Sequence, residues 1–143
     1  MKVFKFGGAS VDSISRIRNL PAILRKYDSE KILIVISAMG KTTNALEKVA
    51  EAFYTGDRSR ALELFNQIRL NHLQIAESLG TGENNIFRQR MSDFFTEVEW
   101  LLHDRPVRSY NYYYDQIVCV GELLSTSIVS SFLHQEMLLD LHS

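Results

Sequence analysis

The chain has 143 residues, of which 45% are hydrophobic and 23% are charged, so it can bury the core of one globular domain. Its formal net charge of −1 argues against a protein that binds nucleic acid or an anionic membrane surface. Cys119 is the only cysteine, so no internal disulfide can form. The first residues show no basic-then-apolar pattern, so we expect no signal segment. Because its apolar runs are also shorter than the ~20 residues of a membrane-spanning helix, we expect a cytoplasmic protein.

The first 36 residues predict a strand, a helix and a second strand. Residues 3–6 and 31–36 are short apolar runs that are typical of strands. The second run has no polar alternation, which indicates a strand covered on both faces. Between them, apolar side chains recur at helical spacing over residues 14–27, and Pro21 should kink or divide that helix. This order indicates a βαβ unit, in which the two strands are parallel.

The middle of the chain predicts a helical excursion that packs beside the sheet. Apolar side chains recur at helical spacing in three segments, residues 46–53, 62–79 and 86–102. The tyrosines and one asparagine of residues 110–114 suggest an aromatic linker, either packed under a loop or used for binding. A last helix is expected from near Asp115 to Phe132, and residues 137–141 look like the opening of another strand.

The turn after the first strand has the features of a phosphate-binding loop. Gly7 and Gly8 follow the strand directly, so the backbone can approach a ligand closely and its amides can point at that ligand from the start of the next helix. Lys5, on the same strand, would place an ammonium group near the same spot. Two glycines after a strand also occur in ordinary turns, so this segment alone allows both interpretations.

A polar loop, residues 37–44, follows the second strand. Its Gly-Lys-Thr at residues 40–42 is similar to the end of a Walker A loop, but that motif also needs a glycine where Val35 stands, so the P-loop interpretation fails. The loop lies where open α/β sheets bind ligands. Asn44 with Glu47 resembles a capping box for the next helix. Two hydroxyls are left to face the same crevice as the glycine turn, those of Ser37 and Thr43.

The third polar feature is Gly121-Glu122, which interrupts the apolar pattern of the last predicted helix. A glycine inside a helix costs roughly 1 kcal/mol, and it lets another backbone or a ligand come close. If Glu122 is buried among its apolar neighbours, it needs a partner, because an unpaired buried carboxylate is costly. Alternatively, it lies on the solvent side of an amphipathic helix, and the residue pattern leaves both readings open.

Other reactive side chains form no recognisable site. The four histidines have no ligand spacing with one another or with acidic residues, so we expect no structural metal site. No nucleophile–base pair is visible either. The serines of the last helix are interpreted as helix surface and small-residue packing rather than as catalytic groups; they are Ser125, Ser127, Ser130 and Ser131.

The three polar segments together resemble the aspartate kinases of the amino acid kinase superfamily. Residues 5–11, Lys-Phe-Gly-Gly-Ala-Ser-Val, are similar to the opening signature of that family, in which a threonine usually stands at the position of Ala9. Residues 35–44 match its second loop nearly residue for residue, and residues 115–125 match its third segment. The order and spacing of the three agree with the family over the whole chain.

The resemblance implies transfer of the γ-phosphate of ATP to the side-chain carboxylate of L-aspartate, which gives 4-phospho-L-aspartate in the first step of lysine, threonine and methionine synthesis. It implies Lys5 as the catalytic residue. The implied phosphate-binding residues are Lys5, Phe6, Gly7, Gly8 and Ser10. The implied aspartate-binding residues are Ser37, Thr43 and Glu122. Mg²⁺ is carried by ATP, so no metal site on the protein is implied.

The chemistry of this reaction agrees with the implied residues. The attacking group is a carboxylate, which is already ionised at pH 7, so no general base is needed. The reaction needs positioning and neutralisation of charge on the transferred phosphoryl group. Lys5, the loop amides and Mg²⁺ can supply positive charge, while Glu122 can pair with the substrate ammonium and two hydroxyls can bind its polar groups.

The implied fold is α/β, with residues 1–143 as the N-terminal portion of a three-layer α/β/α sandwich that has a mainly parallel sheet and a helical excursion. The remaining catalytic and regulatory domains of the family would be absent, so we expect this portion alone to be inactive and the full-length enzyme to be a homo-oligomer. Two alternatives stay open. One is another amino acid kinase, acting on acetylglutamate, glutamate, carbamate or a nucleoside monophosphate; the other is a truncated, non-catalytic product.

Overall fold

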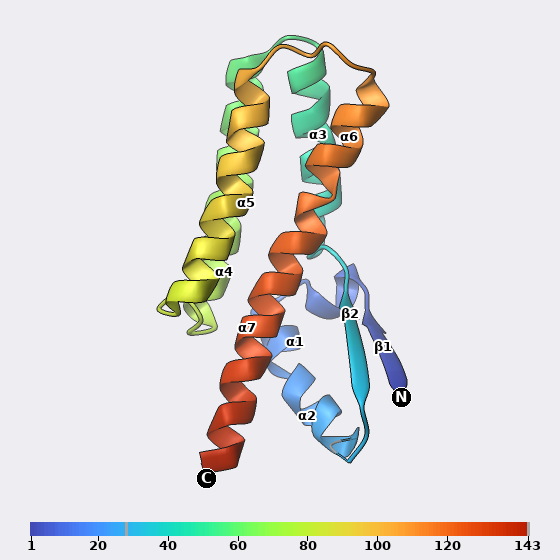
Figure 1. Ribbon diagram of the computed structural model, residues 1–143, viewed down its shortest axis with the longest axis vertical. Coiled ribbons are helices and arrows are strands. Elements are labelled where there is room, and N and C mark those ends of the chain that lie inside the picture. The colour runs from blue at the N-terminus through green and yellow to red at the C-terminus, as the bar shows by residue number, and fades with distance from the viewer. Residues whose placement is uncertain (28, 143) are drawn as a thin grey trace.

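A computed structural model describes the backbone of residues 1–27 and 29–142, and side chains as far as residue 137. The molecule has a sheet part and a helical part, which lie side by side (Figure 1). The sheet part comprises β1 (Lys2–Phe6), the 3₁₀ turn η1 (Gly8–Val11), α1 (Ile14–Arg18), α2 (Leu20–Leu24), the 3₁₀ turn η2 (Arg25–Tyr27) and β2 (Ile32–Ile36). The helical part comprises α3 (Thr42–Tyr54), α4 (Arg58–Ser78), α5 (Asn85–His103), α6 (Tyr110–Val118) and α7 (Val120–His142).

The predicted βαβ unit is confirmed. β1 and β2 are parallel neighbours, with Phe6 opposite Ile36 at their carboxyl ends. The intervening helix is divided near Pro21, as the sequence indicates, because Pro21 stands in the first turn of α2, where its missing amide hydrogen needs no partner. The α/β class, the parallel strands and the helical excursion all agree with the sequence prediction.

Helices cover only one face of the two-stranded sheet. α7 and the short helices α1 and α2 lie on that side (Figure 1), and Phe6 and Ile36 are buried there. On the other face, Val3, Leu33 and Val35 are 59%, 50% and 42% exposed. The prediction that the second strand is covered on both faces is therefore wrong for this structure, since the described residues leave its second face to solvent.

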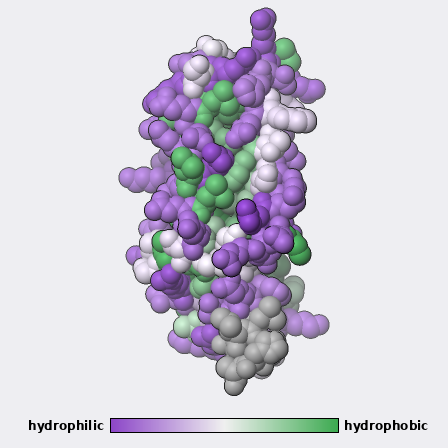
Figure 2. Space-filling view, turned by 90° about the vertical axis from the view of Figure 1, so that its left-hand side faces the viewer, coloured by the Kyte–Doolittle hydropathy of each residue, from purple (hydrophilic) through white to green (hydrophobic). Residues whose placement is uncertain are grey.

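The helical part has an extensive apolar core, and all three predicted helical stripes are confirmed. At its centre, the rings of Phe65 and Phe95 join α4 to α5 edge to face, with their centroids 6.2 Å apart. Asp57 and Asn84 cap these two helices, because their side chains accept hydrogen bonds from amides in the first turn. Figure 2 shows the side formed by α4 and α5, which is mostly hydrophilic with apolar side chains gathered along its middle.

The segment after α5 differs from the prediction. Residues 110–114 are not a linker, since they form the first turns of α6. Tyr113 is nevertheless buried under the preceding loop, where its hydroxyl accepts hydrogen bonds from the amides of Val107 and Arg108 at 2.7 and 3.1 Å. The last predicted helix therefore begins earlier than expected and is interrupted only at Cys119, between α6 and α7.

The strand predicted for residues 137–141 is wrong, because α7 continues to His142. A short apolar run does not distinguish a strand from a buried helix, and here the helix extends through it. By length and composition, Tyr110–Met137 is also apolar enough to cross a membrane, but 56% of its most apolar window is buried inside the protein. The packing of α7 against β2, α2 and the long helices accounts for that composition.

Candidate functional site

Three segments that are distant in sequence meet at the carboxyl ends of β1 and β2: the turn after β1, the loop after β2 and the first turns of α7. Open α/β sheets bind ligands at this edge. The Ser37 amide extends the strand pairing by donating to the Phe6 carbonyl at 3.0 Å, and the Gly40 amide donates to the Gly8 carbonyl at 3.2 Å. Backbone hydrogen bonds therefore join the turn to the loop.

The turn after β1 is a 3₁₀ turn rather than the start of an α-helix. Gly7 is extended, and the turn closes when the Ser10 amide donates to the Gly7 carbonyl at 2.9 Å. A Cβ at Gly8 would lie 3.0 Å from the carbonyl oxygen of Ala38. A side chain at residue 8 would therefore require the turn and the loop to move slightly apart.

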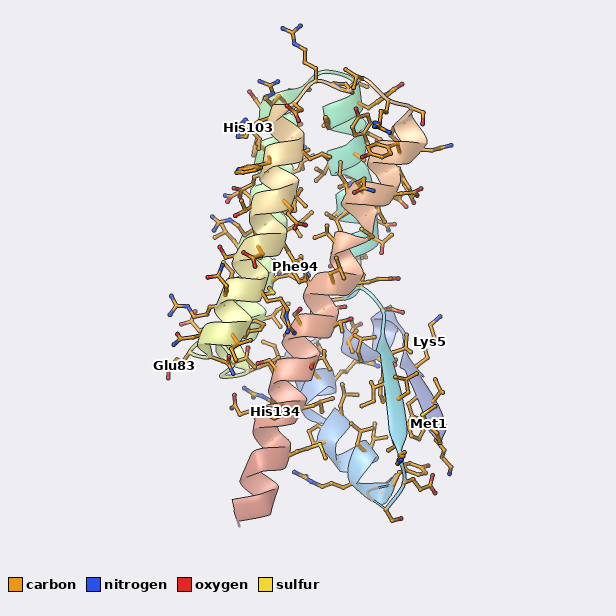
Figure 3. All side chains as sticks on the ribbon, viewed as in Figure 1. Met1, Lys5, Glu83, Phe94, His103 and His134 are labelled. Atoms are coloured by element: carbon orange, nitrogen blue, oxygen red, sulfur yellow. The ribbon has the colours of Figure 1, made fainter. Side chains whose placement is uncertain are left out.

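Lys5 and Phe6 point to opposite faces of the sheet. The Phe6 ring is buried in the core, and the Phe6 carbonyl accepts the hydrogen bond from the Ser37 amide at the start of the loop. Lys5 is exposed on the uncovered face, opposite Val35 in the strand register. Figure 3 shows its side chain at the end of β1, directed away from α7. Lys5 makes no hydrogen bond or ion pair with the residues that the structure describes, so its ammonium group is free to meet a ligand.

The two predicted substrate-binding hydroxyls stand on either side of the loop after β2. Ser37 begins the loop and Thr43 lies in the first turn of α3, and both residues are half-buried. Between them, Gly40 has a φ of 48°, a left-handed conformation that glycine adopts without strain. This reversal leads the chain into α3, so the first turn of α3 follows the end of β2 closely.

The capping box predicted from Asn44 and Glu47 is wrong, because α3 already begins at Thr42 and has no side-chain cap. The Glu47 carboxylate instead accepts a hydrogen bond from the Tyr114 hydroxyl at 2.8 Å, which joins α3 to α6. This hydrogen bond raises the pKa of the Tyr114 hydroxyl, since it stabilises the protonated form. Glu47 therefore supports the helix whose first turn carries Thr43.

Gly121 lets the start of α7 lie directly against the loop and α3. A Cβ at this position would lie 3.0 Å from Cδ1 of Leu46, 3.1 Å from Cβ of Ala38 and 3.3 Å from Cγ2 of Thr42. A side chain here would therefore require these neighbours or α7 to shift slightly. The next residue, Glu122, is exposed, so of the two readings for its carboxylate the solvent-facing one is confirmed.

Ser125 is the residue of this region that the sequence interpretation missed. It is buried, and its hydroxyl donates to the backbone carbonyl of Ser37 at 2.7 Å. Its interpretation as helix surface is therefore wrong, although it does pack as a small residue. The sequence position of Ser125 could have indicated its burial, because it lies one turn after Glu122 within an otherwise apolar stripe.

The structure brings the backbone segments of the predicted site together, but it directs their charged side chains differently. Lys5 lies on the uncovered face of the sheet and points away from α7, whereas Glu122 is exposed on α7. Ser37 follows β2 directly, and Thr43 lies in the first turn of α3. Among the described residues, no group of three or more His, Cys, Asp or Glu side chains is placed to hold a metal ion.

The nearby Cys119 thiol is not suited to act as a nucleophile. Partial burial raises its pKa, and the carboxylates of Glu122 and Asp115 raise it further. Because the thiolate is the reactive form, a raised pKa lowers its share at neutral pH.

Comparison with known proteins identifies the family of this chain. The model of the amino acid kinase family matches residues 1–139. Aspartokinase 2, chloroplastic, from Arabidopsis thaliana is 30% identical over 137 residues, which cover 93% of this chain and 24% of that protein. The crystal structure of E. coli aspartokinase III in complex with aspartate and ADP has a TM-score of 0.73 and 26% identity, covering 95% of this chain and 29% of the other. The complex of the same enzyme with lysine and aspartate has a TM-score of 0.71 and 25% identity over the same shares. This chain spans about a quarter of the length of the relatives it matches.

Proposed function

Because the chain belongs to the amino acid kinase family, we propose that it forms the aspartate site and part of the phosphate site of an aspartate kinase. Such an enzyme transfers the γ-phosphate of MgATP to the side-chain carboxylate of L-aspartate, as the first step of lysine, threonine and methionine synthesis. The observation that carries the proposal is the meeting of three motif segments at one edge of the sheet. One solved relative is a complex with aspartate and ADP. These two ligands correspond to the phosphate acceptor and the nucleotide product of the proposed reaction.

At the phosphate end, the proposal assigns charge neutralisation to Lys5 and to the glycine turn. In the transfer, a carboxylate oxygen forms a bond to the γ-phosphorus while the bond from that phosphorus to the bridging oxygen of ADP breaks. Negative charge shifts onto the leaving ADP, so a free ammonium group beside the phosphates favours the transition state. The amides of Gly7 and Gly8 belong to the turn that follows Lys5 and can contact phosphate oxygens. The Ser10 amide already donates to the Gly7 carbonyl, so the proposal assigns phosphate contact to its exposed hydroxyl. Mg²⁺ bound to ATP would supply further positive charge.

At the aspartate end, the proposal assigns binding to Ser37, Thr43 and Glu122. The exposed carboxylate of Glu122 can pair with the substrate ammonium, and a hydrogen bond between charged groups is stronger than one between neutral groups. The two hydroxyls can hydrogen-bond the polar groups of the substrate. None of the three has to remove a proton, because the attacking carboxylate is already ionised. These three residues therefore act by positioning the substrate carboxylate for attack.

The test is a phosphoryl-transfer assay on the natural protein, purified from its source, with MgATP and one acceptor at a time. The acceptors are L-aspartate, N-acetylglutamate, glutamate, carbamate and a nucleoside monophosphate. We expect ADP release with L-aspartate alone, and trapping of the acyl phosphate by hydroxylamine. Turnover with another acceptor but not with L-aspartate would contradict the proposal, and binding of L-aspartate without any ADP release would favour the non-catalytic alternative.

A further inference from the structure

We propose that Ser125 is a positioning residue of this site, whose hydroxyl on α7 fixes the backbone of Ser37 and so sets the Ser37 side chain relative to Glu122. The inference rests on the proposed function, because it takes Ser37 and Glu122 as groups that bind the aspartate. In this proposal Ser125 does not touch the substrate and acts only through Ser37.

The hydrogen bond of Ser125 joins α7 to the residue that follows β2. Its Oγ lies 2.7 Å from the carbonyl oxygen of Ser37, which is 88 residues away in sequence, and 3.2 Å from the carbonyl oxygen of Glu122, three residues away. The longer contact is the back-bond that many serines make within a helix. A hydroxyl has a single hydrogen to donate, and the shorter distance identifies the Ser37 carbonyl as its main acceptor.

The peptide groups of Ser37 are held from two sides. Its amide donates to the Phe6 carbonyl at 3.0 Å, which continues the pairing of β1 with β2. Its carbonyl lies beyond the end of β2, where the strand pairing stops, and there it accepts from Ser125. With the backbone fixed on both sides, the Ser37 hydroxyl has little freedom besides rotation of its own side chain.

The helix that carries Ser125 is well suited to this role. Gly121 lets the start of α7 lie in close contact with Ala38 of the loop and Leu46 of α3, where an added Cβ would meet atoms at 3.0–3.1 Å. One turn of this helix therefore contains the close contact, the exposed carboxylate of Glu122 and the hydrogen bond to Ser37. The spacing between two aspartate-binding groups is then set by a rigid helical turn rather than by a loop.

The first test is Ser125→Ala, which removes the hydroxyl with little change of volume. Its matched control is Ser127→Ala, because Ser127 is also buried on α7 but makes no hydrogen bond through its side chain to the described residues. In steady-state kinetics, we expect Ser125→Ala to raise the KM for L-aspartate roughly fivefold to tenfold, as the loss of one hydrogen bond would. The KM for MgATP should stay within about twofold of the control, since the phosphate turn keeps its own backbone bonds.

The second test separates positioning from general stability. If Ser125 acts through Ser37, then adding Ser125→Ala to Ser37→Ala should change the KM for L-aspartate by less than about twofold, because the group being positioned is already gone. An equal rise of the KM for L-aspartate in Ser125→Ala and Ser127→Ala would overturn the inference, and so would a full effect in the Ser37→Ala background. A wild-type protein that neither binds nor phosphorylates L-aspartate would overturn the proposed function itself, before any variant is compared.

Discussion

The helical part and the sheet part of this molecule bury their apolar side chains to different extents. In the helical part, Phe65, Met91 and Leu102 are at most 1% exposed. In the sheet part, one face of β1 and β2 leaves Leu33 and Val35 about half-exposed. The short helices of the sheet part also carry fully buried side chains, so among the described residues the two parts differ in the uncovered face of β1 and β2, and the candidate phosphate turn follows β1. Variants in the two parts should separate stability from activity.

The largest expected effect on stability comes from the core of the helical part. Phe65→Ala removes a ring that packs against Phe95, and such truncations typically lower the free energy of unfolding by about 3–5 kcal/mol. The matched change on the uncovered sheet face, Val35→Ala, should lower it by about 1 kcal/mol or less, because this side chain is already 42% exposed. Urea unfolding of both variants measures the difference. Equal losses would mean that the uncovered face is buried in solution.

A large effect on activity with no effect on stability is expected for Lys5→Ala. Lys5 is exposed and has no partner among the described residues, so the free energy of unfolding should stay within about 0.5 kcal/mol. Turnover should fall about 100- to 1,000-fold if its ammonium group neutralises the transferred phosphoryl group. Lys2→Ala, at the other end of the same strand, is the control and should keep the wild-type rate. Turnover of Lys5→Ala at the wild-type rate would refute its catalytic role.

A smaller effect, which again separates the two parts, is the pH dependence of stability caused by His72. This side chain is 1% exposed in the helical part. Its Nδ1 donates to the Ile68 carbonyl at 2.8 Å, and its buried Nε2 has no partner among the described residues. Burial lowers the pKa of His72 below its usual 6.5, and the hydrogen bond to Ile68 opposes this only in part.

Because the folded protein disfavours protonation of His72, the unfolded chain binds the proton more readily. Its contribution to stability is therefore fully present above pH 6.5 and is lost as the pH falls from there through the lower pKa of the folded state. Urea unfolding at pH 8 and at pH 5.5 should show this loss in the wild type and in His134→Gln, whose imidazole is exposed. The loss should shrink in His72→Gln. An unchanged pH dependence in that variant would assign the effect to other groups.

Local patterns predicted much of the fold. The aliphatic runs identified β1 and β2, the helical spacing of apolar residues identified α3, α4 and α5, and Pro21 marked the division between α1 and α2. These features depend on neighbours within a few residues, so a single sequence contains them. The polar segments at the ends of the two strands were found in the same way, whereas the binding roles of their residues came from the family resemblance and stay predictions.

The features that were missed depend on distant contacts. The hydrogen bond of Ser125 to Ser37 joins residues 88 apart, and the partner of Glu47 proved to be Tyr114 rather than its own helix terminus. The tyrosines of residues 110–114 gave no helical spacing, yet packing against α3 orders them as a helix. The apolar run at residues 137–141 is short, and only the continuation of α7 decides between strand and helix.

The central claim is that the exposed carboxylate of Glu122 binds the ammonium group of L-aspartate. Titration calorimetry of L-aspartate into the wild type, Glu122→Gln and the control Glu136→Gln, a glutamate further along α7, tests it most directly. We predict a dissociation constant in the range of about 1 μM to 1 mM for the wild type and the control. Glu122→Gln should bind at least about tenfold more weakly, because a hydrogen bond to a charged group contributes roughly 1.5–3 kcal/mol. Wild-type affinity in Glu122→Gln would contradict the account.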